Sequence, residues 1–150
     1  MKILLLISLA IFTAYIVGVY LKFGILKSVS ASYYSIKHKA LFTLALWGFA
    51  IPVQIYAFIE LQNWCLVLAG IGICFVGAAP DYKMKVEGDV HYLAAFTGVI
   101  LGLIGIAFEG LWYVALPAAV LIVAINSIKN KTYWQEIAAF YIIVLTLLVI

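Results

Sequence analysis

The chain is dominated by six long runs of apolar residues that are separated by short polar segments. The runs cover residues 3–21, 40–59, 64–80, 92–108, 111–128 and 133–150. Each has about the length with which a helix crosses a hydrocarbon core of about 30 Å, roughly 17 to 25 residues. In lipid every backbone N–H and C=O must be paired within its own segment, and the alternating pattern of a barrel strand is absent. The sequence therefore predicts an all-α, polytopic membrane bundle of six transmembrane helices.

The composition excludes a water-soluble globular domain. Hydrophobic residues make up 68% of the 150 residues and charged residues only 10%, whereas soluble domains carry about 25% charged residues. Six spans with their connections use the whole length, so we expect one transmembrane domain over residues 1–150. The first run also has features of a signal peptide, but it is longer than a usual signal core and no small-x-small cleavage site follows Leu21. A first span is therefore favoured.

The positive charges are distributed unevenly over the connections. The chain has nine Lys and no Arg, and eight of the nine border the first, third and fifth connections. The opposite side carries Lys2, Glu60 and Glu109. By the positive-inside rule, the odd-numbered connections are cytoplasmic and both termini lie on the non-cytoplasmic face of the cell membrane. The basic rim also suits the anionic lipid headgroups of the inner leaflet.

Small residues concentrate in the third and fourth runs. Gly98 and Gly102 form a Gly-x-x-x-Gly pair, and Gly105 follows it. Small residues let helix backbones approach closely, which stabilises helix association in lipid. The pattern favours a central antiparallel hairpin of these two runs. It leaves open a homo-oligomer that associates through Gly98, Gly102 and Gly105.

Three polar segments become neighbours once the odd-numbered connections share one side, namely residues 27–39, 81–91 and 126–136. Glu136 lies about one turn inside the sixth run, where a carboxylate needs a partner. Lys83, Lys129 or the imidazole of His91 could supply one. We therefore predict a polar cleft on the cytoplasmic side. Its candidate binding residues are Ser30, Tyr33, Tyr34, Asp81, Lys83, His91 and Glu136.

Metal and nucleotide chemistry are not indicated. The two histidines, His38 and His91, are too few for a three-histidine zinc site, and no H-x-x-x-H or H-E-x-x-H pair occurs. Ser, Asp and His residues on one side permit a nucleophilic triad, but the Gly-x-Ser-x-Gly elbow is missing. We expect no metal, no cofactor and no nucleic-acid partner.

Four motifs follow one another along the chain. They are Ser28-x-Ser30-x-Ser32-Tyr33-Tyr34, Val76-Gly77-Ala78-Ala79-Pro80-x-Tyr82-Lys83, Glu87-Gly88-x-Val90-His91-Tyr92 and Trp134-x-Glu136. In this order and spacing the chain resembles an uncharacterised group of small, six-span integral membrane proteins from bacteria and phages. The resemblance implies six spans. It draws attention to Tyr33, Tyr34, Pro80, Lys83, His91 and Glu136 without assigning them a chemistry.

Three functions compete for such a chain. The first is a cytoplasmic-side cleft that binds or passes a small molecule, an ion or a lipid headgroup. The alternative is a structural or accessory subunit that acts through helix–helix association, and the third is an intramembrane enzyme that modifies lipid. A channel or transporter needs polar groups near mid-membrane, and the apolar runs hold few beyond Gln54 and scattered Ser and Thr. A continuous polar path through one chain is therefore disfavoured, and the cleft stays the first hypothesis, the accessory subunit the second and the enzyme the third.

Overall fold

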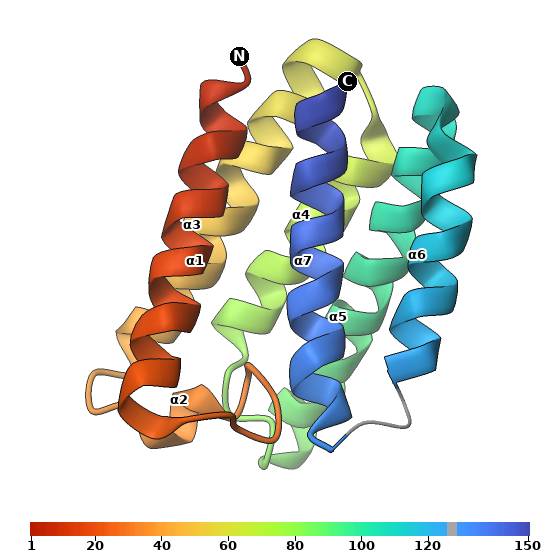
Figure 1. Cartoon of the computed structure of the whole chain (residues 1–150). Coiled ribbons are helices and arrows are strands. Elements are labelled where there is room, and N and C mark those ends of the chain that lie inside the picture. The colour runs from red at the N-terminus through yellow and green to blue at the C-terminus, as the bar shows by residue number, and fades with distance from the viewer. Residues whose placement is uncertain (126–128) are drawn as a thin grey trace.

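The computed structural model describes residues 1–125 and 129–150 (Figure 1). Within these two ranges the chain forms helices joined by turns, with no strand, so the predicted all-α class is confirmed. The helices are α1 (Ile3–Phe23), α2 (Ser32–Ser35), α3 (Ala40–Tyr56), α4 (Trp64–Ala78), α5 (Lys85–Ile106), α6 (Trp112–Ala124) and α7 (Lys131–Val149), with π-helical turns η1 (Ala57–Leu61) and η2 (Ala107–Leu111).

The long helices lie side by side along one bundle, and both termini lie at the end opposite α2 (Figure 1). α4 packs between α3 and α5, and α1 packs on α3. On the other side of the bundle, α7 contacts α1, α5 and α6. The short α2 and the loops around it thus close one end of the bundle near the starts of α5 and α7.

Four helical segments of the described chain are long and apolar enough to cross a membrane. They are Ile3–Phe23, Ala40–Leu61, Lys85–Ala124 and Lys131–Val149, and α4 is apolar but shorter. Lys85–Ala124 is not one straight rod, because the backbone turns at Gly110, where φ is 79°. Glycine adopts this conformation without steric cost. α6 therefore returns alongside α5 as a separate helix (Figure 1).

The helix bounds differ from the predicted ones mainly at α5, which begins at Lys85 and not at residue 92. Its first residues are polar, but polarity determines which part of a helix suits lipid and not where the helix begins. The Gly88 N–H already bonds to the Met84 carbonyl oxygen at 2.7 Å. His91 consequently lies about two turns inside the helix. The predicted end of the fifth run, including Asn126, lies outside the described residues.

Aromatic and aliphatic side chains of α1, α3 and α7 form one part of the core, to which α4, α5 and α6 also contribute buried residues. The fully buried Phe12 ring lies 4.4 Å from the Phe140 ring and 5.3 Å from the Phe49 ring, centroid to centroid. Large apolar side chains are also left uncovered on the outside, and Leu21 and Phe108 are 78% and 74% exposed. Soluble monomers rarely expose large contiguous apolar patches, so this surface suits an apolar surrounding.

Gly98, Gly102 and Gly105 pack inside the chain. A Cβ atom at these positions would lie 3.1, 2.6 and 2.6 Å from side-chain atoms of α4 or α7. Such distances show that the neighbouring helices already occupy the space beside each glycine. These glycines therefore pack within the chain, and a homo-oligomer that associates through them stays a prediction.

Replacing Gly72 by alanine is expected to lower the free energy of unfolding by about 1–3 kcal/mol, because overpacking displaces the neighbouring helix. The new Cβ would lie 2.9 Å from the backbone carbonyl oxygen of Ala94, which has no flexible end to move aside. Gly18→Ala is the matched control, since nothing lies within 4 Å of its new Cβ. Denaturant titration in mixed micelles compares them, and equal stability of the two variants would contradict the close approach of α4 and α5.

Candidate functional site

The serine-rich turn before α2 is held by bonds within itself. Ser28 Oγ accepts the Ala31 N–H at 2.9 Å, and Ser32 Oγ donates to the Val29 carbonyl oxygen at 2.6 Å. Serine hydroxyls often bond to nearby backbone in this way, which favours turns over helix. The hydroxyl of Ser30, between them, instead reaches α5 and α7.

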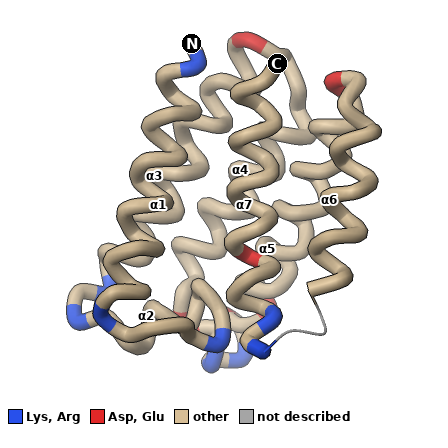
Figure 2. Tube along the Cα trace, in the orientation of Figure 1, with Lys and Arg blue, Asp and Glu red and all other residues tan. Residues whose placement is uncertain are grey.

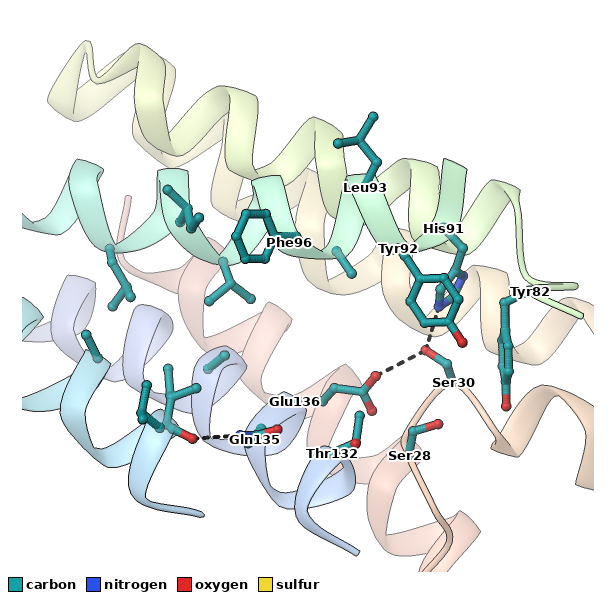
Figure 3. A pocket seen from close by; sticks show the side chains of 18 of the residues that line it. Ser28, Ser30, Tyr82, His91, Tyr92, Leu93, Phe96, Thr132, Gln135 and Glu136 are labelled. Carbon is teal, nitrogen blue, oxygen red and sulfur yellow. Dashed lines mark hydrogen bonds between the residues drawn. The ribbon is translucent and has the colours of Figure 1, made fainter. Parts of the chain in front are cut away.

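His91 of α5 bonds to this turn through one ring nitrogen. Its Nε2 lies 3.0 Å from Ser30 Oγ (Figure 3). Its Nδ1 lies 2.9 Å from the Ala79 carbonyl oxygen. A carbonyl oxygen only accepts hydrogen bonds, so Nδ1 carries a hydrogen. In the neutral ring Nε2 is then an acceptor, so the single hydrogen of the Ser30 hydroxyl is shared between two acceptors, Nε2 of His91 and the Glu136 carboxylate. The His91 side chain is almost fully buried, at 3% exposure.

Glu136 reaches the same turn from α7. One carboxylate oxygen accepts the N–H of Val29, and the other lies 3.3 Å from Ser30 Oγ. Val29 is buried, so the carboxylate satisfies a backbone donor that has little access to water. Ser30 thereby links α5 to α7 through its hydroxyl (Figure 3).

The structure gives Glu136 partners other than the lysines considered above. Among the described residues, the N-terminal amine forms an ion pair with Glu60, with 3.6 Å between the amine nitrogen and a carboxylate oxygen. Neither Lys83 nor Lys129 pairs with the Glu136 carboxylate. The Glu136 carboxylate instead bonds to the backbone of the serine-rich turn, and Ser30 connects it to His91.

These side chains form the polar end of a pocket of about 1120 Å³ between α5, α6 and α7 (Figure 3). The polar end is lined by Lys27, Ser28, Ser30, Tyr82, His91, Thr132, Gln135 and Glu136. The rest of the wall is mainly apolar and includes Phe96, Val99, Ile100 and Leu103 of α5 and Ala119, Ile122 and Val123 of α6. One pocket thus joins a polar group cluster to a long apolar surface.

A second polar cluster lies on the α2 side, outside this pocket. The Tyr34 hydroxyl donates to the Asp81 carboxylate and accepts the Lys83 N–H at 3.1 Å. The Lys83 ammonium lies 4.1 Å from the centre of the Tyr34 ring, and the Lys39 ammonium lies 4.6 Å from that of Tyr33. Burial and the bond to Asp81 raise the pKa of Tyr34 to about 12. Its hydroxyl therefore stays protonated at neutral pH.

The seven predicted site residues consequently fall into two groups. Ser30, His91 and Glu136 line the pocket, and Tyr33, Tyr34, Asp81 and Lys83 form the second cluster. Tyr82 connects the groups, because its ring centroid lies 5.1 Å from that of Tyr34 and 5.3 Å from that of His91.

Most of the residues in the pocket wall were not predicted from the sequence. Thr132, Gln135, Glu136 and Ala139 recur at the spacing of one helix face, as do Tyr92, Ala95, Phe96, Val99, Ile100 and Leu103. This periodicity was available as a signal. The periodicity could not show that these faces of α5 and α7 line the same pocket. In lipid, an apolar helix face can pack either against a neighbouring helix or against the bilayer.

The site offers hydrogen-bond donors and acceptors at one end and apolar surface at the other. Across residues 1–125 and 129–150, no three His, Cys, Asp or Glu side chains gather as a metal site requires. No family model, curated protein or solved structure matches the chain.

Proposed function

We propose that the protein is an integral membrane protein whose six spans are α1, α3, α4, α5, α6 and α7. The exposed apolar side chains and the four long apolar segments support insertion into a bilayer. The turn at Gly110 supports counting α5 and α6 as two spans. α4 has 15 residues, which reach about 22 Å, so its flanking residues complete the crossing.

The charge distribution supports one orientation. Lysine residues gather at the α2 end of the bundle, whereas the opposite end carries the two termini and acidic residues (Figure 2). The α2 end is then cytoplasmic, and both termini lie on the non-cytoplasmic face. Anionic lipid headgroups are the partners that suit this rim, at about 1 kcal/mol per lysine near the surface.

Single cysteines introduced at the two ends are expected to label from opposite sides of the membrane. In a chain carrying Cys65→Ala and Cys74→Ala, a membrane-impermeant maleimide should label Gln62→Cys in intact cells. Lys37→Cys and Lys85→Cys should label only after lysis. All three positions are exposed, so access to the reagent depends on the side. Labelling of the two lysine positions in intact cells would reverse the orientation.

We further propose that the pocket binds one amphipathic molecule, with a polar head and a single long acyl or alkyl chain. The main support for this proposal is that one continuous pocket joins the cluster of Ser30, His91 and Glu136 to the apolar wall of α5 and α6. Ligand pockets are commonly apolar with a few placed polar groups. Here the polar groups lie at one end only, which suits a molecule with the same asymmetry.

Access to the pocket supports a ligand drawn from the bilayer. Tyr92, Leu93 and Phe96 line it and are 61%, 69% and 68% exposed. In the proposed orientation these side chains of α5 face the inner leaflet. A lipid-like molecule can therefore enter sideways without crossing water.

The test compares co-purified lipid in two matched variants. Ala119→Phe puts a large side chain into the apolar wall and leaves the polar end intact. Ala10→Phe adds the same group to an exposed site on α1. A steric cost of about 1–3 kcal/mol predicts that Ala119→Phe retains roughly tenfold less of the bound amphiphile. Mass spectrometry of extracts should find wild-type amounts with Ala10→Phe, and equal retention by both variants would refute the pocket as the binding site.

A further inference from the structure

Ser30 and His91 have the geometry of a nucleophile with its general base. Ser30 Oγ lies 3.0 Å from Nε2 of His91, and the Ala79 carbonyl oxygen holds the opposite ring nitrogen at 2.9 Å. Activated serines are recognised by a base within hydrogen-bond reach and by a third group that fixes the tautomer of the base. The pair is 5% and 3% exposed, yet both residues line the pocket.

We propose that Ser30 is the nucleophile of an acyl-transfer reaction, that His91 is its general base, and that the substrate is a carboxylic ester with one long acyl chain. The proposal rests on the proposed function, because the acyl chain occupies the apolar wall. From His91 to Leu103 that wall extends about 18 Å along α5. An acyl chain lying there places its ester carbonyl at the polar end, beside Ser30.

The step balances with the groups present and one water molecule. Ser30 Oγ attacks the ester carbonyl carbon while Nε2 of His91 takes the hydroxyl proton. The bond between the carbonyl carbon and the alcohol oxygen then breaks, and His91 returns the proton to the leaving alkoxide. The acyl group is left as an ester on Ser30. Water attacks this ester in the same manner, which releases the carboxylic acid and restores the serine.

Neighbouring groups have supporting roles. The Glu136 carboxylate lies 3.3 Å from Ser30 Oγ and favours the imidazolium that forms on His91. By accepting the Val29 N–H it also fixes the turn, so Glu136 is a positioning residue. The hydroxyls of Ser28 and Thr132 line the same end of the pocket (Figure 3). They are donors available to the negative oxygen of the tetrahedral intermediate.

Ser28 and Ser32, on either side of Ser30, make different contacts from it. Ser32 is fully buried and bonds to the Tyr15 hydroxyl and the Val29 carbonyl oxygen. Ser28 accepts the Ala31 N–H and lines the pocket, but it is Ser30 that contacts an imidazole nitrogen. Three serines within five residues are thus expected to differ sharply in reactivity.

The experiment treats the purified full-length chain in lipid nanodiscs with a long-chain alkyl fluorophosphonate. The phosphonyl group should add to Ser30 with loss of fluoride, as located by fragmentation of the tryptic peptide 28–37. Ser30→Ala should abolish the adduct, whereas Ser32→Ala, which lies outside the pocket lining, should keep it. His91→Asn retains a donor for the Ala79 carbonyl but removes the base, so labelling should slow about 10²-fold or more. Cleavage of a fluorogenic long-chain ester should likewise be lost in Ser30→Ala and slowed in His91→Asn.

A non-cleavable alkyl ether analogue separates this proposal from binding itself. If the analogue binds and Ser30 is not labelled, the pocket stands and the nucleophile is refuted. If neither occurs, the proposed function fails as well. Labelling that ignores His91, or that spreads equally over the three serines, would also overturn the acyl-transfer assignment. Labelling without analogue binding would support the nucleophile and refute the long-chain ester as its substrate.

Discussion

Replacement of Glu136 by alanine is expected to lower the free energy of unfolding by about 2–4 kcal/mol. The carboxylate accepts the buried N–H of Val29 and contacts Ser30 Oγ. Losing it leaves a backbone donor unsatisfied, at about 1–3 kcal/mol, and releases the turn from α7. Denaturant titration in mixed micelles measures the loss. Asp89→Ala is the control, because this carboxylate is exposed on α5, and its effect should stay within about 0.5 kcal/mol.

Glu136→Gln separates the structural role of the side chain from the role of its charge. The amide oxygen can still accept the Val29 N–H, so most of the stability should remain. A site that holds charge ready for a ligand should nevertheless lose bound amphiphile. A sharp fall in the melting midpoint, with no amphiphile on either wild type or variant, would leave Glu136 as a purely structural anchor.

Asn63→Ala is expected to destabilise the opposite end of the bundle by about 2–3 kcal/mol. The side-chain oxygen of Asn63 accepts the Leu66 N–H at 3.2 Å and caps α4, which is worth about 1 kcal/mol. Its amide nitrogen donates to the Gly105 carbonyl oxygen at 2.9 Å and to the Glu109 carboxylate at 2.6 Å. Since Asn63 is 7% exposed, water replaces these bonds poorly.

Two further variants test that assignment. Asn63→Asp retains the cap acceptor but loses the donor and places a negative charge beside Glu109, so it should recover little of the stability. Gln62→Ala alters an exposed neighbour and should change unfolding by no more than about 0.5 kcal/mol. Melting curves in detergent compare the three. An Asn63→Ala protein as stable as Gln62→Ala would contradict the buried link between α4 and α5.

The all-helical fold was predictable from the sequence, because long apolar runs can satisfy their backbone in lipid only as helices. The break between α5 and α6 was also predictable, since one apolar run ends at residue 108 and the next begins at residue 111. The start of α5 was predicted wrongly, because the charged residues after Met84 suit a helix that projects beyond the bilayer as well as they suit a loop.

The sequence alone also placed Ser30, His91 and Glu136 on one side of the bundle, because alternate connections of a helical bundle share a side. Only the tertiary structure decided which of the polar residues there meet. The rotation of α5 and α7 brings His91 and Glu136 to Ser30, while Tyr34 and Asp81 pair outside the pocket. Helix rotation depends on side-chain packing between helices, such as the contact of Gly72 with α5. Apolar residues that suit lipid and protein equally well do not encode that rotation in their pattern.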